Sequence, residues 1–168
     1  GGRATWDCVG KKSSSSSSDG GSGSGDFSWV DDALPAGAVA ETTGGDVWEW
    51  VTSNPAPQSG TRAHRSAARP GLHQHYFSVG TPMMVNAGDW LYAYVYLDPQ
   101  NLPSQVMLQW YDGATWDHRA YWGVNQLWWG REGTAECRRM GPLPPAGQWV
   151  RLLVPAHAVG LEGKAVSG

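Results

Sequence analysis

The chain has 168 residues, enough for one domain with a sizeable core. Apolar residues make up 40% of the chain and are too dispersed for a membrane span. The net charge of −3 gives no electrostatic reason to expect a nucleic acid as a partner. Composition therefore argues against a membrane-spanning protein and against a nucleic-acid-binding protein.

The first 25 residues combine a strand-like segment with a tether. Residues 3–8 read as a strand, and two lysines, six serines and a Gly-rich run follow it up to Gly25. A second start follows at Phe27, and no closing strand is evident over residues 165–168. We therefore expect a permuted or incomplete β domain. In it, residues 1–10 are a displaced terminal strand, 11–25 a Ser/Gly-rich linker and 26–168 the β-sandwich body.

The rest of the chain shows short runs rich in Val, Tyr, Trp and Thr, separated by turn residues, without sustained helical periodicity. The runs predict strands at 27–31, 47–52, 72–78, 90–97, 105–111, 116–122 and 148–154. Asp112-Gly113 predicts a hairpin between the fifth and sixth of them. Many short strands in one domain of this size indicate an all-β, antiparallel β-sandwich of jelly-roll type, as in carbohydrate-binding modules.

The predicted strand 90–97 alternates most clearly. Its aliphatic residues share one face and should enter the core, namely Leu91, Ala93, Val95 and Leu97. Its opposite face carries Tyr92, Tyr94 and Tyr96, which form either a second buried layer or an open platform for a ligand.

Polar and aromatic residues on neighbouring segments suit the face of a sheet that binds a ligand. The candidate ligand-binding residues are Tyr92, Tyr94, Tyr96, Gln109, His118, Arg119, Tyr121, Trp128 and Trp129. The aromatic rings would stack on sugars, and Gln109, His118 and Arg119 would donate hydrogen bonds. The alternative for His118 and Arg119 is a structural ion pair with Asp112 or Asp117.

Two cysteines, Cys8 and Cys137, lie far apart in the sequence and show no metal-binding spacing. A disulfide between them would hold the N-terminal strand against the body, whereas the alternative is two unrelated thiols. His73 and His75 have a spacing that could hold a metal, but a packed, hydrogen-bonded pair is the simpler interpretation. No cofactor is required, although a structural Ca²⁺ is possible; its candidate ligands are Asp7, Asp26, Asp31, Asp32 and Asp46.

Several blocks together resemble one module, among them Trp29-Val-Asp-Asp-Ala-Leu-Pro, His73-Gln-His-Tyr-Phe77 and Tyr94-Val-Tyr-Leu-Asp-Pro99. Three further blocks are Val106-Met-Leu-Gln-Trp110, His118-Arg-Ala-Tyr-Trp-Gly123 and Gly147-Gln-Trp-Val-Arg-Leu152. The chain resembles an uncharacterised module of large bacterial surface and secreted proteins, found near RHS-type (YD-repeat) or carbohydrate-active regions. The resemblance implies that one apolar strand runs into the Gly-Arg-Ala-Thr-Trp-Asp segment, which here stands at residues 2–7.

No catalytic pattern is present, because no pair of carboxylates is marked and no nucleophile motif occurs. We therefore expect no enzyme but a non-catalytic binding module, extracellular or on a bacterial cell surface, whose partner is a glycan. The alternative is a structural, assembly or engineered scaffold module. Its open sheet edge would accept a β-strand from a peptide or from a neighbouring protomer.

Overall fold

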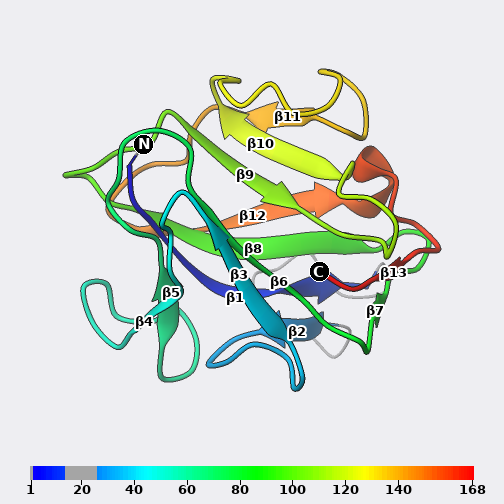
Figure 1. Cartoon of the computed structure of the whole chain (residues 1–168), viewed down its shortest axis with the longest axis horizontal. Coiled ribbons are helices and arrows are strands. Elements are labelled where there is room, and N and C mark those ends of the chain that lie inside the picture. The colour runs from blue at the N-terminus through cyan, green and yellow to red at the C-terminus, as the bar shows by residue number, and fades with distance from the viewer. Residues whose placement is uncertain (1, 14–25) are drawn as a thin grey trace.

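The computed structural model describes residues 2–13 and 26–168 (Figure 1). Within them the chain is almost entirely β-structure, and one short 3-10 helix, Ala156–Val159, is the exception. All strand pairs except β10 with β11 are antiparallel. The predicted all-β, sandwich-like fold class is thereby confirmed. Residues 14–25, which make up most of the predicted linker, lie outside the described residues.

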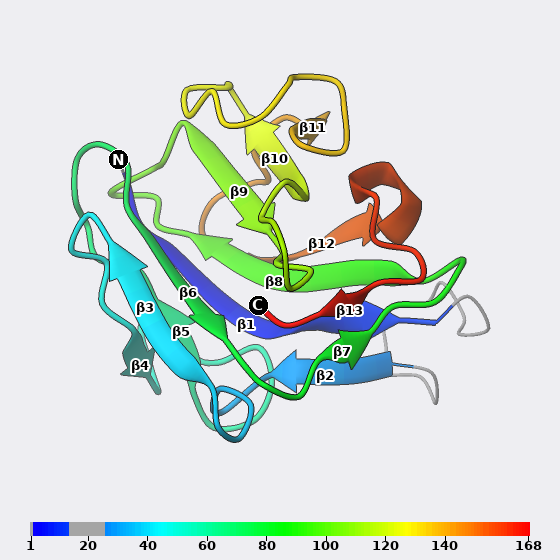
Figure 2. The same cartoon turned by 45° about the vertical axis from the view of Figure 1, so that its right-hand side comes forward.

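The larger sheet has six strands, and the N-terminal strand β1 (Ala4–Lys12) lies in its middle (Figure 2). On one side β1 pairs with β8 (Trp90–Leu97), which in turn pairs with β12 (Trp149–Pro155). On the other side, β5 (Ala63–Arg65) pairs with the first half of β1 and β2 (Asp26–Val30) with its second half. Strand β4 (Glu49–Val51) extends the sheet beyond β5.

The strand β1 is longer than the segment predicted at 3–8, and it includes Lys11 and Lys12, which the sequence placed in the linker. Its register on β8 shifts between Asp7 and Gly10, where Cys8 has a positive φ of 49°. A side chain at Gly10 would place Cβ only 1.9 Å from the backbone oxygen of Phe27 on β2. Glycine is therefore needed where the strand kinks past its neighbour.

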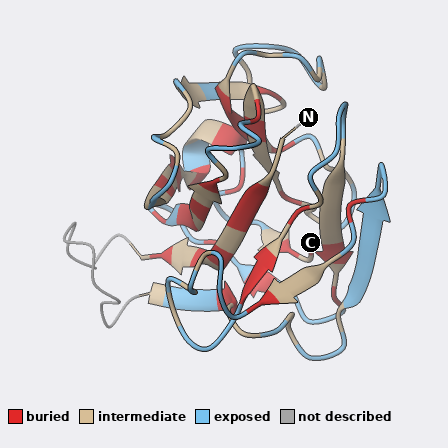
Figure 3. Ribbon diagram, turned by 90° about the vertical axis from the view of Figure 1, so that its left-hand side faces the viewer, coloured by how far each residue is buried: buried red, intermediate tan, exposed pale blue. Residues whose placement is uncertain are grey.

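The opposing layer is divided into separate pieces. The first piece contains β9 (Gln105–Gln109), β10 (Arg119–Gly123) and β11 (Arg138–Gly141). The second pairs β3 (Val39–Thr43) with β6 (Gln74–Ser78), and the third pairs β7 (Met83–Met84) with β13 (Ala165–Val166). The β9–β10 hairpin through Asp112-Gly113 is confirmed. All five residues of β3 are exposed, and the strand forms an outer edge of this layer (Figure 3).

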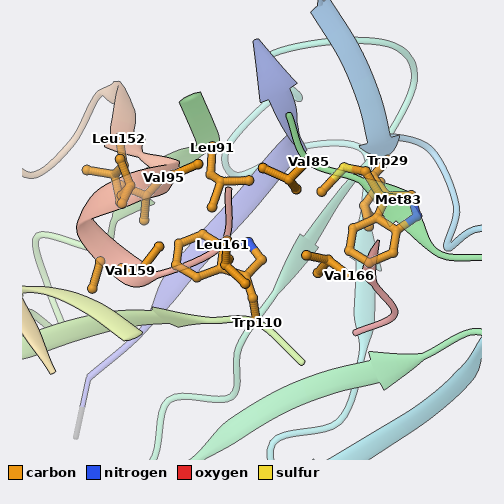
Figure 4. Close-up of a cluster of buried hydrophobic side chains, with 14 of the residues drawn as sticks. Trp29, Met83, Val85, Leu91, Val95, Trp110, Leu152, Val159, Leu161 and Val166 are labelled. Atoms are coloured by element: carbon orange, nitrogen blue, oxygen red, sulfur yellow. The ribbon is translucent and has the colours of Figure 1, made fainter. Parts of the chain in front are cut away.

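The core lies between the two layers. Leu91, Ala93, Val95 and Leu97 are fully buried, which confirms the face predicted for β8. Figure 4 shows Leu91 and Val95 together with Val159 and Leu161, which follow β12, and with Trp110 from the end of β9. Trp29 packs edge-on against Phe77 of β6, with ring centroids 4.9 Å apart.

The predicted disulfide is wrong, because both cysteines are free. Cys8 lies on the outer face of the six-stranded sheet, where its Sγ is 3.9 Å from the hydroxyl of Tyr92. Cys137 is buried beside β10 in the other layer, with its Sγ 3.8 Å from the side chains of Asn125 and Glu132. Burial raises the pKa of both thiols. The central position of β1 explains the error, since this strand is held by backbone pairing and needs no bridge.

Candidate functional site: a groove between β6 and β9

A groove of about 420 Å³ opens between β6 and β9 and reaches down to the inner face of the six-stranded sheet. Ala4, Trp6 and Val30 lie along its floor, while Phe77 of β6 and Leu108 of β9 lie on its two sides. For comparison, an engineered apolar cavity of roughly 150 Å³ is large enough to bind benzene. The groove is therefore large enough for several apolar side chains.

The two strands that flank the groove each lack a neighbour on the side that faces it. Among the described strands, β6 pairs with β3 alone and β9 pairs with β10 alone. In an antiparallel strand, alternate backbone N–H and C=O groups point to opposite sides. One row of donors and acceptors on each strand is therefore left without a strand partner at the groove, next to apolar side chains.

The last two residues of the described chain lie at one mouth of this groove. Ser167 accepts a hydrogen bond from the backbone N–H of Val79, just beyond β6, at 2.8 Å. On the other side, the N–H of Ser167 donates to the oxygen of Tyr111 at 2.8 Å, and the N–H of Tyr111 donates to the oxygen of Gly168 at 2.9 Å. Residues 167–168 thus bridge the ends of β6 and β9 by backbone hydrogen bonds, as a strand between them would.

The opposite mouth of the groove is polar and carries a cluster of histidines around Asp46. Asp46 accepts a hydrogen bond from the Nδ1 of His73 at 2.8 Å and another from the N–H of Ala67 at 3.0 Å. The Nε2 of His73 is 3.0 Å from the backbone oxygen of Gly2. The Nδ1 of His75 lies 3.5 Å from the carboxylate of Asp46. Burial alone would raise the pKa of Asp46, but the interactions with His75 and His73 outweigh it and lower that pKa.

His64, which is buried, and His75, which is half-buried, form the side of this cluster that faces the groove. The Nδ1 of His64 and the Nε2 of His75 are 3.0 Å apart, while the Nε2 of His64 and the Nδ1 of His75 make no hydrogen bond within the described residues. Desolvation, followed by the neighbouring His75, holds the pKa of His64 well below its usual value. The two rings are thus a packed, hydrogen-bonded pair, and Trp48 stacks on His75 at 4.1 Å between centroids.

Side chains reach across the outer side of the groove. The side-chain amide of Gln109 donates to that of Gln74 at 2.6 Å. The ring of Tyr76 contacts Trp116 edge-on at 5.6 Å between centroids, and Trp116 stacks on Tyr111 at 5.2 Å. These contacts hold β6 and β9 together through side chains, without a backbone hydrogen bond between the two strands among those described.

A second, more open cavity of about 410 Å³ lies beside these side chains. Its walls include Arg119, Trp128 and Trp129 together with Gln74 and Gln109. The guanidinium of Arg119 lies 5.8 Å from the ring centre of Trp129 and donates hydrogen bonds to Gln109 and Asp117. Trp128 is 75% exposed and has a positive φ of 56°, an uncommon conformation for a bulky residue.

The structure brings only four of the nine predicted ligand residues to this cavity, namely Gln109, Arg119, Trp128 and Trp129. The tyrosines of β8 lie on the outer face of the six-stranded sheet, on the far side of the core. Tyr92 is buried there, and the guanidinium of Arg151 covers it at 4.8 Å from the ring centre. Trp149 packs on Tyr96, so the Tyr face is closer to a second packed layer than to an open platform.

The two remaining candidates are buried and already have partners. The ring of His118 lies between the backbone oxygen of Val159, 2.7 Å from Nδ1, and the carboxylate of Asp112, 3.0 Å from Nε2. Hydrogen bonds from the amides of Thr115 and Ala114, and then from His118, lower the pKa of Asp112 to about 2. The hydroxyl of Tyr121 donates to Glu132. His118 thus fits the structural alternative, with Asp112 as its partner.

Three of the groove residues that were not predicted from the sequence are Trp6, Phe77 and Leu108. Each belongs to an alternating apolar pattern, which by itself indicates a core position. What a single sequence does not show is which two strands lie next to each other. The sequence led us to expect an open sheet edge, but it did not show which strands form that edge.

No model of a known protein family, no curated protein and no solved structure matches the chain. In the described part of the chain, no three His, Cys, Asp or Glu side chains are grouped so that they could hold a metal ion. Structural calcium therefore stays a prediction. Residues 2–13 and 26–168 also contain no helix with the length and apolar character needed to cross a membrane.

Proposed function

We propose that the chain is a strand-accepting module, in which an apolar β-strand other than those described fills the groove between β6 and β9. The observation that carries the proposal is the position of Ser167 and Gly168, which bond to the ends of both flanking strands. A strand continuing in this path would give β6 and β9 their missing neighbour. It would join the pieces of the second layer by β-augmentation, in which backbone hydrogen bonds provide affinity and side-chain pockets provide specificity.

The apolar lining of the groove indicates which kind of segment can bind there. Its floor and sides are mostly apolar, which favours a strand with apolar residues on one face over a polar ligand. Each described strand is already paired, so none of them is free to enter a neighbouring molecule without leaving its own sheet. The accepted strand is therefore a segment outside the described strands, with alternating apolar residues, rather than one of these strands from a second copy.

A peptide titration tests this proposal. A synthetic peptide of about eight residues that alternates Val and Thr should bind and change the fluorescence of Trp6 and Trp48, which line the groove. The same peptide with one central residue replaced by Pro should bind far more weakly, because Pro removes a backbone donor and fits poorly in a central strand. Equal binding of the two peptides, or no binding of either, overturns the proposal.

A pair of variants and a mass measurement complete the test. Leu108→Asn, in the groove, should abolish binding, whereas Leu102→Asn, at an exposed position outside the groove, should leave it unchanged. Light scattering over a concentration series should show one constant mass without peptide. Growth in mass that the peptide prevents would contradict the chosen occupant and assign the groove to a second copy.

The cavity around Trp128 favours a second candidate function, carbohydrate binding. An exposed Trp beside Arg119, Gln74 and Gln109 offers a stacking surface next to hydrogen-bonding groups, a combination that suits sugar rings. A glycan array would test it, with Trp128→Ala as the variant and Trp90→Ala, at another exposed Trp, as the control. Binding that is lost only in Trp128→Ala supports this function, and an array without hits contradicts it.

A further inference from the structure

Resting on the proposed function, we infer the direction and the phase of the accepted strand. It runs antiparallel to both β6 and β9, starting at the mouth where Gly168 lies. The side chains of the first, third and fifth residues after Gly168 point into the core. These three positions are apolar, and the alternate positions are polar or small.

The direction follows from three segments that lie alongside one another. Strands β6 and β9 run the same way on either side of the groove, and residues 165–168 run the opposite way (Figures 1 and 2). The pairing of β13 with β7, which is antiparallel, agrees with this arrangement. A strand that continues the path of residues 165–168 is therefore antiparallel to both neighbours, the geometry of the other pairs that β6 and β9 already form.

The phase follows from the geometry at Gly168. The N–H of Ser167 and the oxygen of Gly168 both bond to Tyr111, so two residues face one, as at a β-bulge. A Cβ at position 168 would lie 2.6 Å from the backbone oxygen of Phe77 on β6. The side chains nearest to it are those of Tyr111, whose Cβ is 3.2 Å away, and Trp116, whose ring is 3.0 Å away. Both of these residues lie on the outer side of the groove, so position 168 points outward and the next residue points inward.

The floor of the groove gives the inward positions their chemistry. Along the floor, Ala4 and Trp6 follow one another on β1, and Val30 of β2 lies beside Val9, farther along the same strand. Phe77 and Leu108 line the two sides of the groove. These neighbours are apolar, and His64 and His75 join them only towards the Gly2 mouth, so each inward apolar side chain leaves water on binding.

The outward positions meet a different surface. They face Gln74, Tyr76 and Gln109, which are half-buried and carry amide or hydroxyl groups. An incoming strand has to break the hydrogen bond between the side chains of Gln74 and Gln109. Polar or small residues suit the outward positions, because they leave these amides with polar partners and place no apolar surface in water. β6 and β9 have five residues each, which sets the length of the paired segment at about five residues.

The phase is tested by extending the chain directly after Gly168, because a covalent link prevents a peptide from sliding by one residue. One variant adds Val-Thr-Val-Thr-Val-Thr, and its partner of identical composition adds Thr-Val-Thr-Val-Thr-Val. We expect the first to raise the urea midpoint and to slow amide exchange of β6 and β9 by at least about tenfold relative to the second. The free alternating peptide is titrated into the unextended chain in parallel.

The outcomes separate the two proposals. An equal increase in both extended variants overturns the phase and leaves strand acceptance intact. No increase in either variant, with binding of the free peptide, overturns the direction from Gly168. No increase and no peptide binding overturn the strand-accepting function itself.

Discussion

The two layers of the molecule are built from the same alternating pattern, but only one of them forms a continuous sheet. In the six-stranded sheet, β1 lies between β8 on one side and β2 and β5 on the other. In the opposing layer, β6 and β9 lie on either side of a groove, and within residues 2–13 and 26–168 only side chains and residues 167–168 join them. Among the described strands, the six-stranded sheet has a central strand, whereas the opposing layer has none between β6 and β9.

This contrast shows what a central strand contributes. β1 supplies backbone partners to three neighbours and buries Ala4 and Thr5. The second layer has the flanking strands and the apolar floor, but its inner side chains border open space. A missing strand therefore leaves both unpaired backbone groups and unfilled volume, and one incoming segment satisfies both.

The largest predicted effect comes from making the same substitution in both layers. Leu97 is fully buried in the six-stranded sheet, and Leu97→Ala should lower the free energy of unfolding by about 3 kcal/mol. Leu108 borders the groove, and Leu108→Ala should cost only about 1 kcal/mol, since less packing is lost there. Urea unfolding of both variants measures the difference, and equal losses would show that the groove is as tightly packed as the core.

The second prediction concerns the hydrogen bonds that anchor the β9–β10 hairpin to the residues following β12. His118→Ala should lower the free energy of unfolding by about 2 kcal/mol, because the Val159 oxygen and the Asp112 carboxylate lose their buried donor. His157→Ala, an exposed histidine nearby, is the control and should have little effect. Chemical denaturation compares the two variants. A free energy of unfolding that His118→Ala leaves unchanged would show that this ring does not stabilise the fold.

The third prediction uses pH to compare the two faces of the six-stranded sheet. His64, on the groove side, has a pKa well below 6.5 because it is buried, so the unfolded chain binds its proton first. Its contribution to stability is therefore present above pH 6.5 and is lost as the pH falls below that value. Asp7, on the outer face, has its pKa raised to about 6, mainly by burial, so below pH 6 the folded chain takes up the proton first. This group stabilises the fold as the pH falls from about 6 towards 3.8.

The two variants should therefore change the pH dependence in opposite directions. Between pH 7 and pH 5, His64→Asn should flatten the loss of stability, and Asp7→Asn should steepen it by about 1 kcal/mol. Thermal unfolding over this pH range measures both, and each variant serves as the control for the other. A parallel shift of both pH profiles would contradict the assignment.

The smallest predicted effect concerns the thiols. Because Cys8 and Cys137 are free and lie in different layers, a reducing agent should change the free energy of unfolding by less than about 0.5 kcal/mol. Thiol counting under denaturing conditions should find both groups reactive. A midpoint that falls on reduction would indicate a bridge and would contradict the separate positions of the two residues.

Alternation along the chain was enough to predict the core face of β8 and the β9–β10 hairpin, because both depend on local patterns. The short strands β5, β7 and β13 were missed, since two or three residues contain too little pattern to separate them from loops. The strands β3 and β11 were missed for a different reason. β3 is exposed throughout and β11 is mostly polar, so neither shows an apolar face.

The candidate site depended on long-range pairing, which a single sequence does not reveal. Tyr92 and Trp128 were predicted as members of one ligand face, yet they lie in different layers because β8 belongs to the larger sheet. The predicted open edge required knowledge of which strands flank it. The two flanking strands can be identified only from the structure, in which β6 and β9 each have one strand partner among the described strands.

Amide hydrogen exchange of β6 and β9, followed with and without the alternating Val/Thr peptide, tests strand acceptance most directly. We predict that amides of these strands facing the groove exchange rapidly in the free chain, while those of β1 and β8 are protected. Adding the peptide should then protect the groove-facing amides without changing β1. Groove-facing amides that are already protected, or that exchange at the same rate with the peptide present, would contradict the account.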